Sequence, residues 1–199
     1  MKSFFPVLLA ILVSVFGIEA VAQFSWVNPL PQGNSLRAVD FVSPAMGFAA
    51  GEAGTLLKTT DGGTHWEILP SGVFYNLYDI AATDTLHAAA SGDSGNVLIT
   101  SDGGGNWAET NLGVDQQVTK VSMLSPSLIF AATAGQQVFR TTDGGATWQT
   151  SLTTVPGVIR DMSFPTADTG YIVGGWGAYN DSAGYLMRTS NGGLDWEVL

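Results

Sequence analysis

Apolar and polar residues alternate along residues 36–42, LRAVDFV, and the β-branched and aromatic members of this run predict a β-strand. Three more short, largely apolar segments follow: MGFAAG at 46–51, TLLKTT at 55–60 and HWEIL at 65–69. Turn residues separate them: Ser43-Pro44-Ala45, Glu52-Ala53-Gly54 and Asp61-Gly62-Gly63. The pattern therefore predicts four short antiparallel strands joined by tight turns.

The same unit recurs along the chain. Its third turn reads TTDGGTHW, TSDGGGNW, TTDGGATW and TSNGGLDW, with Asp61, Asp102, Asp143 and Asn191 in the third place, at steps of 41, 41 and 48 residues. Four strands in about 40 residues is typical of a propeller blade. The sequence predicts an all-β fold, a β-propeller of four-stranded antiparallel blades, with about four blades present at 34–72, 73–113, 114–155 and 156–199.

The recurring turn residues are best explained by folding. The short side chains of the four Asp and Asn residues are suited to accept hydrogen bonds from the N–H groups of their own turn. We expect the tryptophan of each motif to lie on the fourth strand and to pack over its own hairpin and the next sheet. Identical neighbours in every unit assign a structural role, rather than catalysis or metal binding, to Asp61, Trp66, Asp102, Trp107, Asp143, Trp148, Asn191 and Trp196.

The last unit is longer than the others. The first strands stay in step at Val39, Ile80, Val121 and Met162, so the seven extra residues fall after Met162 in GGWGAYNDSAGYL, between the second and third strands. In a propeller, these loops lie on the face opposite the motif hairpins. The insertion is therefore expected to enlarge the loop face.

The loop face holds the candidate binding residues. They are two arginines where first strands begin, two acids in equivalent turns, and four residues of the insertion: Arg37, Arg160, Glu52, Asp93, Trp176, Tyr179, Asp181 and Tyr185. Aromatic side chains in an exposed loop serve as interface anchors or sugar-stacking platforms. The alternative is that Trp176 and Tyr185 only pack the enlarged loop against its blade.

Trp26 suggests that the ring has further blades. Its segment FSWVNPLPQG aligns with HWEILPSG, which predicts an outer strand at 23–33. The sequence then contains five copies of the fourth strand of a blade but only four copies of its first strand. We expect these residues to be the N-terminal part of a larger propeller. The rival is a closed four-bladed ring, and an open arc would expose the sides of its first and last blades.

Residues 1–22 have the form of a signal peptide: Lys2, an apolar run from Phe4 to Ile18, and Ala20-Val21-Ala22 as the cleavage site. An uncleaved N-terminal anchor is the alternative. No later segment approaches the ~20 apolar residues of a membrane span. The expected location is periplasmic, cell-surface or secreted.

Composition excludes several kinds of site. The chain has no cysteine and two histidines, so disulfides, thiolate sites and His-rich metal sites are ruled out, and we expect no cofactor. The net charge of −10 argues against nucleic acid as a partner, because phosphate would be repelled.

The unit LRAVDFVSPAMGFAAGEAGTLLKTTDGGTHWEIL and the half-unit IRDMSFPTADTGYIVGG resemble the photosystem II stability/assembly factor family, a branch of the BNR or Asp-box repeat proteins. The motif TTDGGTHW is the Asp box of these proteins. The resemblance implies a seven-bladed propeller and a non-enzymatic assembly chaperone with an arginine-rich patch. The matching first-strand positions here are Arg37, Tyr78, Thr119 and Arg160, so only two of four carry arginine.

Three functions remain open at this stage. The first is a non-enzymatic exported scaffold that binds a protein or a cell-surface glycan, and the second is a genuine photosystem II chaperone, in which case the location is the thylakoid lumen. The third is a fragment of a sialidase- or xyloglucanase-like glycoside hydrolase, which would need a carboxylate pair. Asp79 and Asp161 occupy equivalent repeat positions, and two of the four arginines, Arg140 and Arg188, belong to the repeat, so we expect no enzyme.

Overall fold

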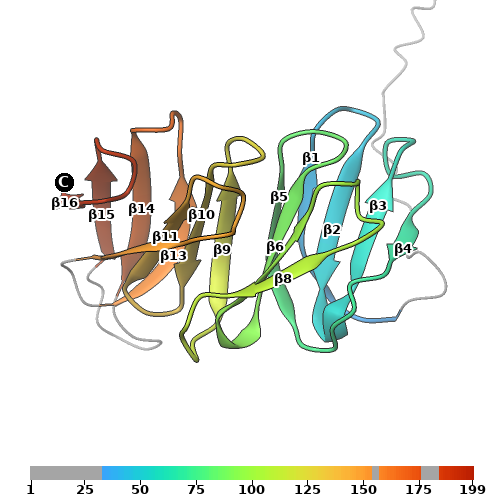
Figure 1. Ribbon diagram of the computed structural model, residues 1–199, viewed down its shortest axis with the longest axis horizontal. Helices are drawn as coiled ribbons and strands as arrows, with labels where there is room; N and C mark the ends of the chain where they lie inside the picture. The colour runs from blue at the N-terminus through green and yellow to red at the C-terminus, as the bar shows by residue number, and fades with distance from the viewer. Residues whose placement is uncertain (1–32, 154–156, 176–183) are drawn as a thin grey trace, which may run out of the picture.

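The computed structural model describes residues 33–153, 157–175 and 184–199, which form four antiparallel four-stranded sheets (Figure 1). Blade 1 contains β1 (Leu36–Phe41), β2 (Gly47–Gly51), β3 (Leu56–Thr59) and β4 (Glu67–Leu69), and blade 2 contains β5 (Leu77–Ala82), β6 (Ala88–Gly92), β7 (Asn96–Thr100) and β8 (Ala108–Asn111). Blade 3 contains β9 (Val118–Met123), β10 (Ile129–Thr133), β11 (Gln137–Thr141) and β12 (Gln149–Leu152), and blade 4 contains β13 (Val158–Ser163), β14 (Gly170–Gly175), β15 (Gly184–Thr189) and β16 (Glu197–Val198). The predicted all-β fold of four-stranded blades is confirmed.

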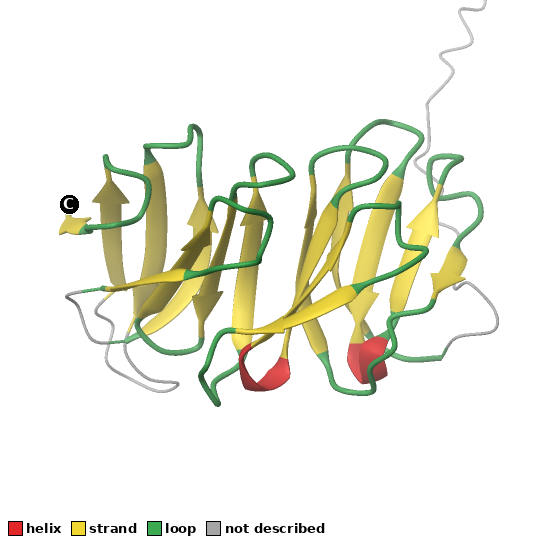
Figure 2. Cartoon of the chain, viewed as in Figure 1, coloured by secondary structure: helices red, strands yellow, loops and turns green. Residues whose placement is uncertain are grey.

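Consecutive strands pair within each blade, and the blades stand side by side in sequence order with blades 1 and 4 at the two ends (Figure 1). Short 3-10 turns, η1 (Glu52–Gly54) and η2 (Asp93–Gly95), follow the second strands of blades 1 and 2. Figure 2 shows both turns on one face, which we call the loop face. The Asp boxes lie on the opposite face beside the loops after the first strands, where the Gly62 N–H donates to the Ala45 carbonyl at 2.7 Å.

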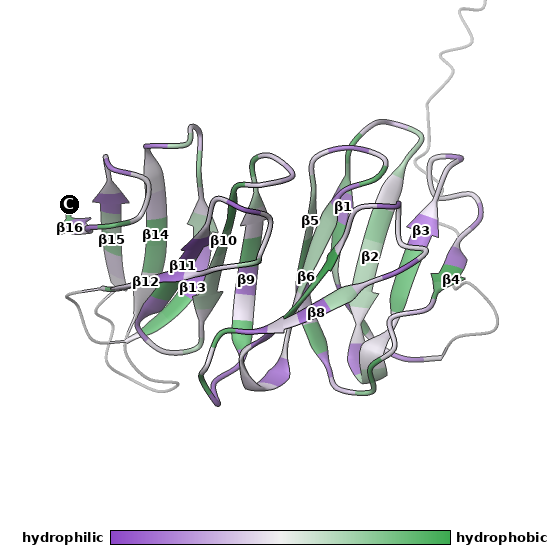
Figure 3. Cartoon of the chain, in the orientation of Figure 1, coloured by the Kyte–Doolittle hydropathy of each residue, from purple (hydrophilic) through white to green (hydrophobic). Residues whose placement is uncertain are grey.

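The apolar core lies between the blades. Each blade has a leading flank, which faces the blade before it, and a trailing flank, which faces the blade after it. Between blades 1 and 2, the trailing flank supplies Phe48 and Leu56, and the leading flank supplies Leu77, Ile80 and Leu98. These side chains are at most 4% exposed. Figure 3 shows the corresponding apolar stretches along the strands.

The Asp-box tryptophans pack over their own hairpins, as expected, but Trp107, Trp148 and Trp196 meet the preceding blade instead of the next one. Trp107 lies against the cluster that contains Leu69 of the preceding blade; Trp196 belongs to the cluster that contains Val138 of blade 3, and its Nε1 donates to the Ser151 hydroxyl at 3.3 Å. Each tryptophan also directly precedes its fourth strand instead of lying on it. The second glycine of the box also lies against the preceding blade: a Cβ at Gly104 would press on the end of the Leu69 side chain, and its φ of 93° itself favours glycine.

Several predicted features lie outside the described residues. These are the signal peptide at 1–22, the outer strand at 23–33 apart from Gly33, and most of the insertion, whose positions 176–183 fall between β14 and β15. Within the described ranges, the structure contains no helix with the length and apolar character needed to span a bilayer.

Candidate functional site

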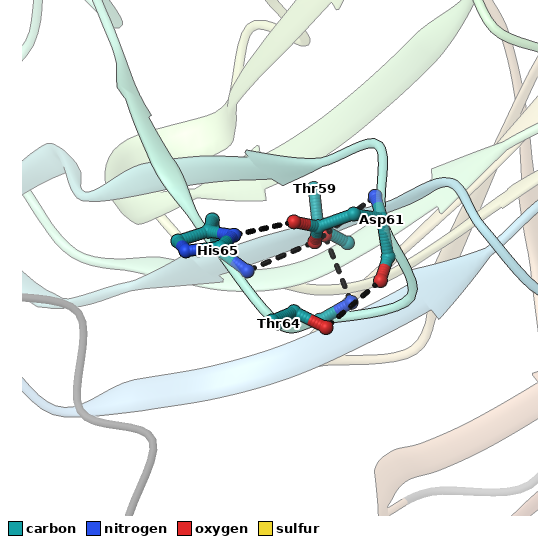
Figure 4. Close-up of polar contacts among 5 residues, drawn as sticks. Thr59, Asp61, Thr64 and His65 are labelled. Atoms are coloured by element: carbon teal, nitrogen blue, oxygen red, sulfur yellow. Dashed lines mark hydrogen bonds and ion pairs between the residues drawn. The ribbon is translucent and has the colours of Figure 1, made fainter.

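The Asp-box turn is held together by its own side chains. In blade 1, the Asp61 Oδ1 accepts hydrogen bonds from the Thr59 hydroxyl at 3.0 Å and from the His65 N–H at 2.8 Å, while Oδ2 lies 2.6 Å from the His65 Nδ1 (Figure 4). The Thr59 oxygen accepts the Gly63 N–H at 2.9 Å, and the Thr64 hydroxyl donates to the Asp61 carbonyl at 3.1 Å. The carboxylate is thus engaged inside the turn.

The other three turns repeat this geometry. Asp102 accepts the Asn106 N–H at 2.9 Å and Asp143 accepts the Thr147 N–H at 2.9 Å. In blade 4, the Asn191 amide oxygen accepts the Asp195 N–H at 3.0 Å, and its NH₂ group donates to the Asp195 carboxylate at 2.9 Å. The turn therefore needs an acceptor oxygen at this position and not a negative charge.

These hydrogen bonds stabilise the ionised carboxylates. The pKa of Asp61 is lowered to about 2, chiefly by the His65 backbone N–H. The pKa of Asp102 is also lowered to about 2, chiefly by the Asn106 side-chain amide, and that of Asp143 to about 2, chiefly by the Thr147 hydroxyl. All three are acceptors at neutral pH, unsuited to act as general acids.

Predicted loop-face residues of blades 1 and 2 form one network. The Arg37 guanidinium lies 2.8 Å from the Glu52 carboxylate and its carbon lies 5.2 Å from the centre of the Tyr78 ring. The Tyr78 hydroxyl donates to the Asp93 Oδ1 at 2.7 Å, and the Asp93 Oδ2 accepts the Asn76 N–H at 3.1 Å. Burial first, and then the Asp93 hydrogen bond, raise the pKa of the Tyr78 hydroxyl. Arg37, Glu52 and Asp93 therefore tie two blades together through Tyr78.

Arg160 occupies the matching position on β13 but has a different environment. Its side chain is exposed, and within the described part of the chain it makes no hydrogen bond or ion pair. Its positive charge lowers the pKa of Tyr185, against the larger effect of burial, which raises it. Arg160 is thus an exposed cation without a polar partner among the residues that the structure describes.

Tyr185 is a core residue and not part of an exposed loop. It is the second residue of β15, is 9% exposed and packs in the cluster between blades 3 and 4. The strand begins at Gly184, inside the segment expected to be loop, so the alternation of β15 turns Tyr185 toward blade 3. The other predicted residues of the insertion, Trp176, Tyr179 and Asp181, lie outside the described residues.

A charged cluster joins the first strands of blades 2, 3 and 4, which run side by side (Figure 1). The Lys120 ammonium lies 3.8 Å from the Asp79 carboxylate and 3.5 Å from that of Asp161. The Asp79 Oδ2 also accepts the Val121 N–H at 3.1 Å, and burial raises the pKa of Asp79. Sequence reasoning missed Lys120, although the change from Asp to Lys at one repeat position was a visible signal.

Metal ligation finds no support in the described ranges, where no group of three His, Cys, Asp or Glu side chains is placed to hold an ion.

Solved structures show what this fold is similar to. YCF48 bound to a D1 peptide matches with a TM-score of 0.66 and 21% identity over 86% of this chain and 56% of that one. YCF48 from Cyanidioschyzon merolae matches with a TM-score of 0.66 and 21% identity over 85% and 57%. A GH74 enzyme from Niastella koreensis matches with a TM-score of 0.64 and 14% identity over 83% and 30%.

Sequence comparison adds nothing to these matches, since no protein-family model and no curated protein matches the chain. The chain spans little more than half the length of the YCF48 structures that it resembles. At these identities the likeness defines the fold alone, and that fold is a β-propeller.

Proposed function

We propose that the protein is a non-enzymatic, exported propeller scaffold that binds a segment of another protein on its loop face. The observation that carries the proposal is Arg160, an exposed guanidinium without a partner among the described residues. A guanidinium presents five N–H donors in a planar fork and suits carboxylate groups. A similar propeller, YCF48, has been solved with a D1 peptide bound.

The test is peptide binding by the purified chain. The probes are a D1 peptide and a phage-displayed library of random peptides, and binding is measured by fluorescence anisotropy. Replacement of Arg160 by Ala is expected to weaken binding about tenfold or more, the effect of one charged hydrogen bond. The matched control is His65→Ala on the opposite face, where affinity stays unchanged. Equal affinity of wild type and Arg160→Ala contradicts the site.

The two probes also separate two biological roles. Binding of the D1 peptide favours a photosystem II chaperone, located in the thylakoid lumen. Selection of unrelated peptides without D1 binding favours another protein partner. A source organism without photosystem genes removes the chaperone role altogether.

Glycan binding and hydrolysis form the second candidate, favoured by the likeness to GH74 enzymes. The Asp79 and Asp161 carboxylates both lie near the Lys120 ammonium, which compensates their negative charge. We therefore do not assign them the general-acid and nucleophile roles of a glycosidase pair. We therefore propose no catalysis at this pair. Turnover of xyloglucan or a sialoside that is lost in Asp161→Asn would overturn this view.

Export rests on the sequence of residues 1–22. N-terminal sequencing of the protein from a periplasmic or culture fraction is expected to begin at Gln23. A mature protein that keeps Lys2 would instead support the uncleaved anchor.

A further inference from the structure

The groove between blades 2 and 3 contains a hollow on the Asp-box face. Its volume is about 510 Å³. Blade 2 contributes Ile99, Ala108 and Thr110 to its lining, and blade 3 contributes Pro126 from the loop after β9 and Gly144 from its Asp box. Both walls belong to blades that have a described neighbour on each side.

A row of residues paired across the second, third and fourth strands explains why the hollow lies in this groove. In three blades the middle residue of the row is a cation and its partner on the second strand is aromatic. These rows are Phe48–Lys58–Glu67 in blade 1, Phe130–Arg140–Gln149 in blade 3 and Tyr171–Arg188–Glu197 in blade 4. The row of blade 2 is Ala89–Ile99–Ala108, with neither an aromatic ring nor a cation.

The cation fills the corresponding space in the two neighbouring grooves. Between blades 1 and 2, the Lys58 ammonium donates to the carbonyl of Gly103 at 2.9 Å and lies 5.8 Å from the centre of the Phe48 ring. Between blades 3 and 4, the Arg140 Nε would lie 3.4 Å from a Cβ placed on Gly192. Gly103 and Gly192 are each the first glycine of an Asp box, so in both grooves this glycine lies against a cation of the blade before it.

Blade 2 supplies no such cation. Ile99 packs in the cluster that contains Ala89, where the other blades have an aromatic ring, and its end lies against Gly145, the second glycine of the next box. Among the described residues, no donor forms a hydrogen bond with the carbonyl of Gly144, the counterpart of Gly103. The hollow therefore combines apolar walls with a carbonyl acceptor whose counterpart in the groove before it binds an ammonium.

We infer that this hollow binds the lysine side chain of a partner protein. Lysine suits it because its four-carbon stem packs along apolar surface while the ammonium reaches a polar group. The chain itself uses the same ammonium-to-carbonyl contact at Lys58. The net charge of −10 favours a cationic partner over an anionic one. The hollow and Arg160 lie on opposite faces, so this is a second binding surface, independent of the one proposed above.

The test is an NMR titration of the isotope-labelled full chain with N-acetyl-lysine methylamide. Saturable shifts of the Gly144 and Ala146 amide signals are expected. Ile99→Lys supplies the missing cation from within, as Lys58 does in its own groove, and is expected to weaken binding tenfold or more. Phe74→Lys is the matched control: it adds the same charge at a site that is 92% exposed between blades 1 and 2 on the loop face, and binding is expected to persist. Circular dichroism verifies that each variant is folded.

The ammonium is tested with N-acetyl-norleucine methylamide, which has the same stem without the charge and is expected to bind at least tenfold more weakly. Equal shifts from both compounds, or no shifts from the lysine compound, overturn the inference. Stronger binding of the arginine analogue overturns the choice of lysine.

An exposed neighbour of the hollow provides a test without any change in the core. Ala108→Glu is expected to strengthen binding of the lysine compound about two- to fivefold, and Ala108→Lys to weaken it by a similar factor, because a charge at this position adds an exposed ion pair or a like-charge repulsion. Equal affinities of the two variants place the compound elsewhere and overturn the inference. Arg160→Ala is expected to leave this binding unchanged, which separates it from the peptide site on the loop face.

Discussion

The Thr141 hydroxyl donates a hydrogen bond of 2.7 Å to the Asp143 carboxylate, and the same oxygen accepts the Gly145 N–H at 3.0 Å. Thr141 is 1% exposed, so this oxygen is out of reach of water. The pair joins the end of β11 to the turn that follows it, and the other three blades contain the same pair. One buried hydroxyl thus fixes both the Asp or Asn and the second glycine of each box.

Replacement of Thr141 by Val is expected to destabilise the protein by about 1–3 kcal/mol, because the Gly145 N–H and the Asp143 carboxylate lose a partner while the shape is kept. Urea unfolding followed by tryptophan fluorescence measures this change. Thr141→Ser keeps the hydroxyl and is expected to lose much less. Equal stability of the two variants would refute the role given to the oxygen.

Acid stability depends on the three Asp-box carboxylates. Their folded-state pKa values, about 2, lie below the ordinary aspartate value of 3.8, so the unfolded chain binds more protons between these values. Their stabilising contribution is complete above pH ~4 and is lost as the pH falls toward 2. Asn at positions 61, 102 and 143, as in the natural Asn191 turn, is expected to flatten the dependence of unfolding free energy on pH in this window. An unchanged slope would exclude these groups as its source.

Aromatic packing couples blades 3 and 4. The Phe130 and Phe164 rings stack with centroids 3.6 Å apart and planes at 12°, and Phe164 meets Trp196 edge-on at 6.0 Å. A double-mutant cycle with Leu at both positions is expected to give a coupling of about 0.5–1.5 kcal/mol. The control cycle pairs Phe130 with Phe41 of blade 1, where additive effects are expected. A Phe130–Phe164 coupling near zero would contradict the contact.

Lys120 is expected to stabilise the folded state by neutralising Asp79. Lys120→Met leaves a largely buried carboxylate without its cation, at a cost of about 1–3 kcal/mol near pH 7. The missing cation raises the folded-state pKa of Asp79 further, so the variant regains stability as the pH falls and Asp79 takes up a proton. Adding Asp79→Asn to Lys120→Met should recover much of the loss at pH 7. Denaturation at pH 4 and pH 7 measures both effects.

The blades could be predicted because each unit repeats its own local signals. The run LRAVDFV became β1 at Leu36–Phe41, and the glycines of the turn at Asp61 adopt φ values of 71° and 88° that favour glycine. These features depend only on neighbours in sequence.

Contacts between blades were harder to predict. A fixed period shows that Trp66 and Trp107 are equivalent, but it does not tell which adjacent blade a tryptophan meets. The Arg37–Tyr78 contact and the Lys120 cluster each join residues that lie one repeat apart. Such contacts depend on the angle between one blade and the blade before it. Tyr185 was misplaced because the position of the insertion within its segment decides which residues belong to β15.

The second glycine of the Asp box gives blades 2, 3 and 4 the same orientation toward the blade before, since Gly104 lies against Leu69, Gly145 against Ile99 and Gly193 against Phe130. Any blade therefore offers its successor the surface that its predecessor offered it. When evolution adds or removes one whole repeat, the two blades that become neighbours meet through faces that already fit each other. An insertion or deletion of only a few residues does not preserve this fit. The number of blades can consequently change during evolution by the gain or loss of whole repeats.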